Sequence, residues 1–324
     1  MMKVIAITGG TGFVGKALSK KLLADNYQPR ILTRRLPKNR LPDMQYAVID
    51  YDDTHSVEKA VENCDVVVHL AAALFCRSKE DFEKANTQNT RALVNAVNTL
   101  KKKPAKIIYI SSLAAGGPSS NADKPRTEDM KENPVSFYGK TKLAGEEEIK
   151  RLDDTIEFTI LRPPIVYGKH DSGFSKIAKF VKKGFMINAG GKDVFFSFIF
   201  LADLIEVIKT AVENPNVMGK TYYVCENSVY NWKTFIQLMS EAMKVKMPMM
   251  ITMPGPLVYL MGYIYEFTSG LMCKTPIFNR DKARESNAGN WIAYSGRWER
   301  DTNWEGWTPL KEGLKKSFEK EENN

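Results

Sequence analysis

Apolar runs of strand length alternate with helix-length stretches through the first half of the chain. The runs predict β-strands, and the stretches between them predict α-helices. Because the two kinds of element alternate, we expect an α/β protein with a doubly wound parallel sheet and helices on both faces. The expected strands are residues 3–8, 30–33, 46–49, 66–70, 106–111 and 158–162, and the expected helices are residues 12–25, 55–62, 82–100 and 135–151.

The alternation weakens after Gly168, although residues 195–200 predict another strand and residues 202–213 another helix. We therefore expect the chain to leave the sheet and to come back to it. The sheet domain would comprise residues 1–168 and 193–226. A smaller second lobe would comprise residues 169–192 and 227–324.

The longest apolar stretch, residues 253–273, is interrupted by prolines, glycines and Glu266, which argues against a membrane span. Within residues 254–278, apolar and aromatic side chains recur near helical spacing. Such a helix is consistent with a lid over an apolar substrate, with packing inside the second lobe, or with contact at a membrane surface. Packing is the commonest role of such a stripe.

The composition is that of a globular protein, with 43% hydrophobic and 26% charged residues among 324. The net charge of +9 is dispersed and no nucleic-acid recognition motif accompanies it, so no nucleic-acid partner is expected. Four separated cysteines without a CxxC pair and a start without a signal sequence favour the reducing cytoplasm. No metal is expected, because no ligand pattern includes His55, His69 or His170.

A glycine-rich segment, TGGTGFVG, begins at Thr8, where the first expected strand gives way to a helix. A helix N-terminus behind a tight glycine turn binds a pyrophosphate, because free N–H groups and the helix dipole face the anion. Gly9 would make the turn, Gly12 would let the phosphates approach the backbone, and Gly15 would let the helix pack closely on the strand. The other residues expected at the cofactor in this loop are Thr11, Phe13 and Val14.

The second expected strand ends at Thr33 and is followed by Arg34 and Arg35. At this position a carboxylate binds the ribose hydroxyls of NAD, whereas arginine accommodates the 2′-phosphate of NADP. The arginines favour NADP, with NAD and a merely solvated basic loop as the alternatives. Asp50 ends the third expected strand, where its carboxylate could hold the adenine amino group.

Tyr138 and Lys142 stand four residues apart in an expected helix, so both project from one face. A free phenol has a pKa of about 10, and a nearby ammonium favours the phenolate and would lower that pKa. Tyr138 could then exchange a proton with a substrate oxygen while hydride moves to or from a nicotinamide.

Ser111 and Ser112 stand at the carboxyl end of a central strand, which is the edge where ligands bind in doubly wound sheets. Ser112 could donate a hydrogen bond to the oxygen that Tyr138 protonates, and Ser111 is the less favoured candidate. A serine pair that only caps the strand end is the structural alternative.

Taken in order, these segments resemble the extended short-chain dehydrogenase/reductase family of the NAD-dependent epimerase/dehydratase superfamily. The resemblance covers most of the chain and implies a Rossmann fold with a smaller C-terminal substrate lobe. It also implies a homodimer formed through helices that flank the sheet. The matching segments are TGGTGFVG, VVVHLAA at 66–72, KANTQNT around Asn86, ISSLAAGGP, YGKTK, LRPPIVYG at 161–168, FSFIFLADL at 196–204 and GWTPLKEGL at 306–314.

The resemblance implies that Ser112, Tyr138 and Lys142 are the catalytic set, with Lys142 also holding the nicotinamide ribose. Ala71 and Ala72 would pass under the phosphates. Asn86 would order water or backbone near the cofactor, unless it is a helix N-cap. Ser111 is a further expected neighbour of the cofactor. The 162–166 segment would line the nicotinamide pocket, with Pro163, Ile165 and Val166 at the cofactor.

Three further positions are expected to be structural or are left open. His69 is expected to be a packed or backbone-bonded residue, and Asp203 is expected to cap the returning helix. The family often has a histidine where Phe200 stands, which leaves that local contact open.

The residues after Ser112 indicate which reaction of the family to expect. Leu113, Ala114 and Ala115 stand where related dehydratases carry acidic residues, so elimination of water is disfavoured. SSLAAGGP is similar to the branch of hydroxysteroid dehydrogenases and dihydroflavonol-type reductases. We therefore expect an NADP-preferring oxidoreductase that interconverts a secondary alcohol and a ketone on a moderately apolar small molecule.

Two other functions stay open. A nucleotide-sugar epimerase would need only the serine, the tyrosine and a tightly bound NAD. A non-catalytic NADP-binding scaffold or sensor subunit is the second alternative, although such relatives often lose the tyrosine or lysine that this chain retains.

Overall fold

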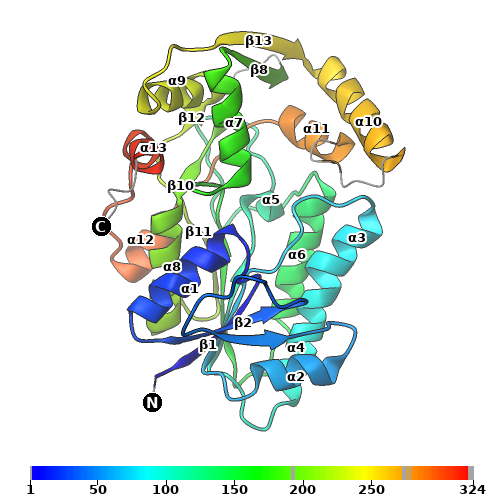
Figure 1. Cartoon of the computed structure of the whole chain (residues 1–324), viewed down its shortest axis with the longest axis vertical. Helices are drawn as coiled ribbons and strands as arrows, with labels where there is room; N and C mark the ends of the chain where they lie inside the picture. The colour runs from blue at the N-terminus through cyan, green and yellow to red at the C-terminus, as the bar shows by residue number, and fades with distance from the viewer. Residues whose placement is uncertain (1, 191–193, 272–275, 277–278, 320–324) are drawn as a thin grey trace.

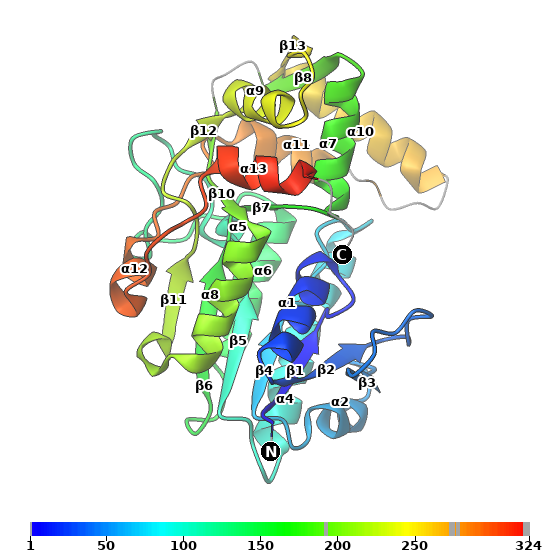
Figure 2. The same ribbon diagram turned by 60° about the vertical axis from the view of Figure 1, so that its left-hand side comes forward.

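A computed structural model describes residues 2–190, 194–271, 276 and 279–319 of the chain (Figure 1). Seven parallel strands form one sheet, and a smaller lobe lies beyond its carboxyl edge (Figures 1 and 2). In spatial order the strands are β11 (Lys220–Tyr223), β6 (Glu157–Arg162), β5 (Lys106–Ile110), β4 (Val66–His69), β1 (Val4–Thr8), β2 (Gln28–Thr33) and β3 (Gln45–Val48). The predicted Rossmann fold class is confirmed.

The strand order reverses between β1 and β4, which pair directly through Ile5 with Val66 and Thr8 with His69. From β1 the chain continues outward to β2 and β3, and from β4 it continues the other way to β5 and β6. In an open parallel sheet, ligands bind outside the carboxyl ends of the strands at such a switch point. The glycine turn follows β1 at this place.

Helices cover both faces of the sheet, so the strands read as apolar runs without alternation. Ile5 and Ile7 pack with one layer of helices, whereas Ala6 packs with the other. The first layer consists of α1 (Phe13–Ala24) and α8 (Leu201–Glu213), and the second of α2 (Thr54–Val61), α4 (Asn89–Thr99) and α6 (Phe137–Ile149).

The smaller lobe is built around an aromatic core in which Phe198 stacks on Phe235 at a ring distance of 4.9 Å. Two short strand pairs join this lobe to the sheet domain, β7 (Ile165–Tyr167) with β10 (Phe198–Phe200) and β9 (Phe195–Phe196) with β12 (Tyr230–Asn231). Its other elements are α7 (Ser172–Lys182), β8 (Phe185–Gly190), α9 (Trp232–Ala242), β13 (Met249–Pro254), α10 (Gly255–Leu271), α11 (Arg280–Asn287) and α13 (Leu310–Phe318).

Two predicted elements differ in the structure. The helix expected over residues 82–100 consists of α3 (Lys79–Glu83), a π-helical turn η1 (Lys84–Gln88) and α4. The strand expected at residues 195–200 is split into β9 and β10 at Ser197, whose N–H donates to the Trp291 carbonyl, and neither part joins the large sheet. The strand that returns to the sheet is β11, which the apolar pattern did not predict.

Three short elements complete the described fold: α5 (Leu113–Gly116), η2 (Pro215–Val217) and α12 (Gly296–Thr302).

The apolar segment at 254–278 contains α10, and residues 272–275, 277 and 278 of it lie outside the described residues. Packing within the lobe does not account for its stripe, because most of its large apolar side chains are exposed. No helix in the described part of the chain has both the length and the hydropathy to cross a bilayer.

Candidate active site

The glycine turn has the geometry of a phosphate cradle. Gly9 has a φ of +67°, and a Cβ there would lie 2.9 Å from the Ala71 nitrogen. A Cβ on Gly15 would lie 2.4 Å from the Gly9 oxygen, so this glycine lets α1 approach the turn itself, whereas we expected it to approach the strand. Gly12 is the N-cap residue of α1 and no side chain caps that terminus. The first N–H groups of α1, which include Phe13 and Val14, therefore fit a dinucleotide pyrophosphate.

Behind the turn, His69 holds the ends of β1 and β4 together. Its Nδ1 lies 2.6 Å from Thr8 Oγ1, and its Nε2 lies 3.0 Å from Thr90 Oγ1. Because Thr90 Oγ1 donates to the Asn86 carbonyl, it must accept from Nε2–H, which leaves Nδ1 to accept from Thr8. Burial lowers the pKa of His69 to about 3, which keeps the ring neutral in this arrangement. The expected packed role fits these contacts, although its partners are side chains.

The loop after β4 is fixed beside the glycine turn. Ala71 N–H donates to Thr8 Oγ1 over 3.1 Å, while Ala72 is exposed. Asn86 is fully buried; its Oδ1 accepts from Ala73 N–H at 2.8 Å, and its Nδ2 donates to Thr141 Oγ1 at 3.1 Å. The N-cap alternative for Asn86 is wrong, because it lies inside η1 and orders the backbone of this loop.

The basic loop after β2 lies at the carboxyl edge of the sheet. Arg34 and Arg35 are exposed, and Thr33 Oγ1 donates to the Arg35 carbonyl at 2.8 Å. Asp50 is exposed beyond β3, and one of its carboxylate oxygens accepts from Asp52 N–H at 3.0 Å. These side chains are therefore accessible at the edge of the sheet where the glycine turn also lies.

The candidate catalytic side chains come from α6 and from the end of β5. Ser136 caps α6 by accepting from Gly139 N–H, and Tyr138 and Lys142 follow one turn apart. Ser112 caps α5, and its hydroxyl lies close enough to the Tyr138 side chain to lower the pKa of that phenol. Lys142 Nζ donates to the Ile110 carbonyl over 2.7 Å. Tyr138, Ser112 and Lys142 are thus brought together at the carboxyl edge of the sheet.

The electrostatics of this group correct one expectation. Burial raises the pKa of Tyr138 to about 12, and the neighbouring Ser112 hydroxyl offsets this only in part. Burial also lowers the pKa of Lys142 to about 7, against the opposing effect of Glu146. The expected lowering of the tyrosine pKa is therefore wrong, because desolvation is the largest influence on the Tyr138 pKa and raises it.

The two neighbouring serines face different ways. Ser111 is buried, and its Oγ donates to Glu146 Oε1 at 2.5 Å. Glu146 in turn pairs with Arg162 at 2.6 Å inside the protein, and Arg162 reaches Glu132 at 2.9 Å. Ser111 and Arg162 are therefore engaged in a buried network, and the expectation that Ser111 contacts the cofactor does not fit its geometry.

The segment after β6 lies next to α5. The Pro163 carbonyl accepts from Leu113 N–H at 2.9 Å, Ile165 is 40% exposed, and Val166 pairs with Ile199. Phe200, at the position where a histidine is frequent, packs its ring 5.5 Å from that of Tyr167. The contact at this position is therefore apolar.

Asp203 is not the cap of α8. It lies in the first turn, and its carboxylate accepts from both Thr308 N–H and Thr308 Oγ1 at 2.7 Å. The expected cap role is wrong, because Asp203 holds the C-terminal segment instead.

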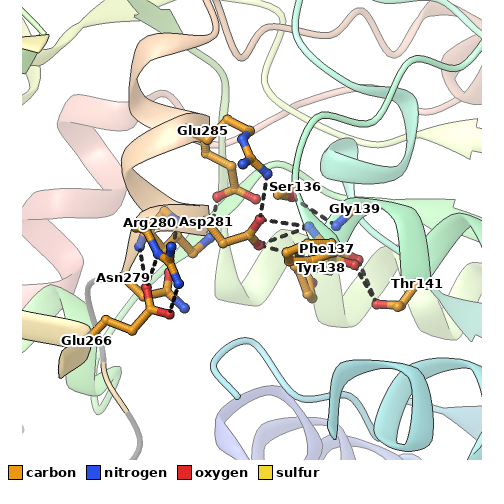
Figure 3. Close-up of polar contacts among 12 residues, drawn as sticks. Ser136, Phe137, Tyr138, Gly139, Thr141, Glu266, Asn279, Arg280, Asp281 and Glu285 are labelled. Atoms are coloured by element: carbon orange, nitrogen blue, oxygen red, sulfur yellow. Dashed lines mark hydrogen bonds and ion pairs between the residues drawn. The ribbon is translucent and has the colours of Figure 1, made fainter. Parts of the chain in front are cut away.

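One residue at this site was not expected from the sequence. Asp281 on α11 accepts from Phe137 N–H at 2.9 Å and from Tyr138 N–H at 3.5 Å (Figure 3). The carboxylate is buried against the N-terminus of α6, where a negative charge is favourable. No local signal identifies it, since 143 residues separate it from Tyr138.

The fold and this geometry together define a class of dinucleotide-dependent α/β enzymes. The chain belongs to the NAD dependent epimerase/dehydratase family, whose model matches residues 5–225. This confirms the expected relation to the extended short-chain dehydrogenase/reductase superfamily, and with it an enzyme of an NAD(P)-dependent family.

Similar proteins catalyse several reactions. A ceramide reductase of Caulobacter vibrioides is 25% identical over 97% of this chain and 90% of its own length. A UDP-glucose 4-epimerase of Vibrio cholerae is 29% identical over 70% and 71%. A sterol-4-alpha-carboxylate 3-dehydrogenase of Dictyostelium discoideum is 24% identical over 87% and 94%.

Solved structures are similar in fold. A human epimerase family protein with NADPH has a TM-score of 0.78 at 20% identity, with 97% of this chain and 98% of that chain covered. The UDP-glucose 4-epimerase of Thermotoga maritima has a TM-score of 0.78 at 17% identity, with 97% of each chain covered.

Proposed function

We propose that this protein is an NADP-preferring oxidoreductase that interconverts a ketone and a secondary alcohol on a moderately apolar, lipid-like substrate. The observation that carries the proposal is the meeting of Ser112 and Tyr138, one helical turn from the buried Lys142. They lie at the same edge of the sheet as the glycine turn.

In the proposed reaction each of the three side chains has one task. NADPH, when bound, supplies a hydride to the carbonyl carbon. Tyr138 gives its phenolic proton to the carbonyl oxygen, which leaves an alcohol product and a phenolate. Ser112 donates a hydrogen bond to that same oxygen, and the Lys142 ammonium stabilises the phenolate. A Tyr138 pKa of about 12 keeps the phenol protonated at neutral pH, so Tyr138 has a proton to donate to a ketone oxygen.

The surroundings of Tyr138 support an apolar substrate. Cys76, Phe82 and Ala114 are buried against it, and Phe137 and Trp291 are partly buried in the same cluster. The exposed side chains of Leu74 and Phe75 stand in the neighbouring loop. Two similar proteins that match nearly the whole chain are named for a ceramide and a sterol carboxylate.

The test of the reaction is NADPH oxidation with a panel of apolar ketones. Tyr138→Phe and Ser112→Ala should each lower turnover by about 10²-fold or more, since each removes one partner of the reacting oxygen. Ser111→Ala is the matched control, because this neighbouring hydroxyl bonds to Glu146 and should affect stability more than turnover. Full turnover in Tyr138→Phe would refute the proposal, whereas NADPH binding by the wild type without turnover of any ketone would support the scaffold alternative.

The preference for NADP rests on the exposed Arg34 and Arg35 after β2. A double change to serine should weaken NADPH binding about tenfold or more, as expected for lost charge-assisted hydrogen bonds, and leave NADH binding nearly unchanged. Thermal shift over a range of ligand concentrations measures both. Lys101→Ser, in the loop after α4, is the control, and equal losses for both nucleotides would contradict the assignment.

A nucleotide-sugar epimerase is the second candidate, favoured by the similarity to the Vibrio cholerae enzyme. Such an enzyme would keep NAD bound through purification and show no net oxidation of added nucleotide. Absorbance and mass analysis of the gel-filtered protein separate the two candidates. Retention of stoichiometric NAD would favour the epimerase.

We further propose a cytoplasmic homodimer that associates through helices flanking the sheet. Cys64, Cys76 and Cys225 are buried and free, which supports a reducing compartment. Sedimentation equilibrium tests the dimer.

A further inference from the structure

The outer end of the smaller lobe carries a two-stranded ribbon with apolar side chains on both faces. β8 and β13 pair in parallel, with Phe185 opposite Met249 and Ile187 opposite Ile251. These four side chains are exposed, Met249 by 66%, whereas Met186 on the other face is buried in the lobe core. A ribbon that faces water on one side normally carries polar residues there. The outer face is therefore suited to an apolar environment.

The helix that follows, α10, extends this apolar surface at the same end of the molecule (Figures 1 and 2). Val258 is buried, and Gly262 packs on Asn279 and Ala283 of the α11 segment. The helix is thus apolar around its circumference, which in water is unusual for a helix with only one packed side. Its exposed large apolar side chains are Leu257, Tyr259, Leu260, Met261, Tyr263, Ile264 and Tyr265.

The charges in the segments that carry most of this surface have one sign, and Glu266 near the end of α10 pairs with Arg280. Residues 172–190 and 242–265 contain no aspartate or glutamate. They contain six exposed lysines, Lys176, Lys179, Lys182, Lys183, Lys244 and Lys246, and none of these pairs with a carboxylate in the described part of the chain. Exposed apolar and aromatic groups beside unpaired lysines are complementary to an anionic lipid surface.

We propose that β8, β13 and α10 form a docking surface for an anionic lipid bilayer. The apolar side chains enter the interface between headgroups and acyl chains, while the lysines contact the headgroups. A second copy of this chain fits less well, because a two-fold contact would bring the lysines of both copies together. The proposal does not depend on the proposed reaction.

The docking surface is joined to the candidate catalytic helix by a short series of contacts. Glu266 near the end of α10 pairs with Arg280, whose Nη2 lies 3.0 Å from Glu266 Oε1 (Figure 3). The next residue, Asp281, accepts from the backbone of Phe137 and Tyr138. A docked α10 would therefore hold the N-terminus of α6 at a defined place relative to the bilayer.

The test is cosedimentation of the full chain with phosphatidylcholine vesicles, with and without about one third phosphatidylglycerol. We expect the protein to pellet with the anionic vesicles, and to do so less at 0.5 M than at 0.1 M NaCl because salt screens the lysines. Leu260→Glu combined with Ile264→Glu should reduce binding about tenfold or more, since both side chains are about half exposed and their replacement leaves the lobe core intact.

Two control variants keep the result interpretable. Val48→Glu places an acid at an exposed apolar position on the far edge strand β3 and should leave binding unchanged. Lys179→Glu with Lys182→Glu should reduce binding to anionic vesicles, whereas Lys101→Glu with Lys102→Glu should do so much less. Wild-type protein that stays in the supernatant with anionic vesicles at 0.1 M NaCl overturns the proposal. Binding of the α10 double variant equal to that of the wild type overturns it too. A third contrary outcome is a wild-type protein that binds no vesicles but forms a dimer, where the α10 double variant is a monomer.

Discussion

Lys142 has almost no exposed surface, and its charge is enclosed by a carbonyl and a ring. Its Nζ lies 2.7 Å from the Ile110 oxygen and 4.1 Å from the centroid of Tyr109. Burial lowers its pKa from 10.5 to about 7, because desolvation disfavours the ammonium. The spacing to Tyr138 was readable from the sequence, but this pKa was not, since it depends on strands that are distant in the chain.

The lowered pKa makes stability depend on pH. Between about pH 7 and pH 10.5 the unfolded chain binds more protons at Lys142 than the folded protein does, so the free energy of unfolding should rise with pH. The contribution is at most about 1.4 kcal/mol per pH unit. Lys142→Met should remove this rise when urea unfolding is measured from pH 7 to pH 9.5 in the absence of nucleotide.

Lys140→Met provides the matched control, because Lys140 is exposed on the same helix. Its stability should follow that of the wild type at every pH. If the Lys142→Met and wild-type curves ran parallel, the folded protein would not hold this lysine with a depressed pKa.

At the scale of elements, the turn from β1 into α1 depends on a close approach of backbone to backbone. The place on Gly15 where a Cβ would stand is 2.6 Å from Gly10 Cα and 2.4 Å from the Gly9 oxygen. The glycine spacing predicted this turn, because the strand, the turn and the helix are consecutive in the chain. The partner that fixes the turn, Ala71 in the loop after β4, comes from the neighbouring strand and was expected only through family resemblance.

Gly15→Ala should push α1 away from the turn and destabilise the fold by about 1–3 kcal/mol, as overpacking does. It should also reduce the thermal stabilisation by NADPH, because the phosphate cradle opens. Gly173→Ala, likewise near the start of a helix, meets only the Asp171 carboxylate at 3.4 Å and should be neutral or slightly stabilising. Equal effects of the two changes on nucleotide binding would contradict the role given to Gly15.

At the scale of the whole molecule, the smaller lobe contributes to the site through α11. Asp281 bonds to the first N–H groups of α6, and burial raises the pKa of its carboxyl. The chain must pass through the whole lobe before Asp281 meets Phe137, so no local pattern predicts the contact. The same holds for β11, which completes the sheet beside β6 only after the excursion through β9 and β10.

Asp281→Ala should leave buried N–H groups of α6 without an acceptor, at a cost of about 1–3 kcal/mol. We expect ketone reduction to fall about tenfold through displacement of Tyr138, with little change in the KM for NADPH. Asp281→Asn keeps one acceptor oxygen and should therefore restore part of the stability and part of the rate of ketone reduction. Undiminished turnover in the alanine variant, together with wild-type stability, would show that the lobe does not position Tyr138.

The sequence by itself determined the parallel sheet, the glycine turn and the one-turn spacing of Tyr138 and Lys142. Each of these follows from short apolar runs that alternate with helical stretches, from the helical period of 3.6 residues, or from side chains within one short segment. Tertiary structure alone decided that Ser111 turns to Glu146, that Asp281 holds α6, and that Tyr138 and Lys142 are desolvated. Burial and long-range hydrogen bonds are properties of the packed chain, so they arise only when distant segments meet.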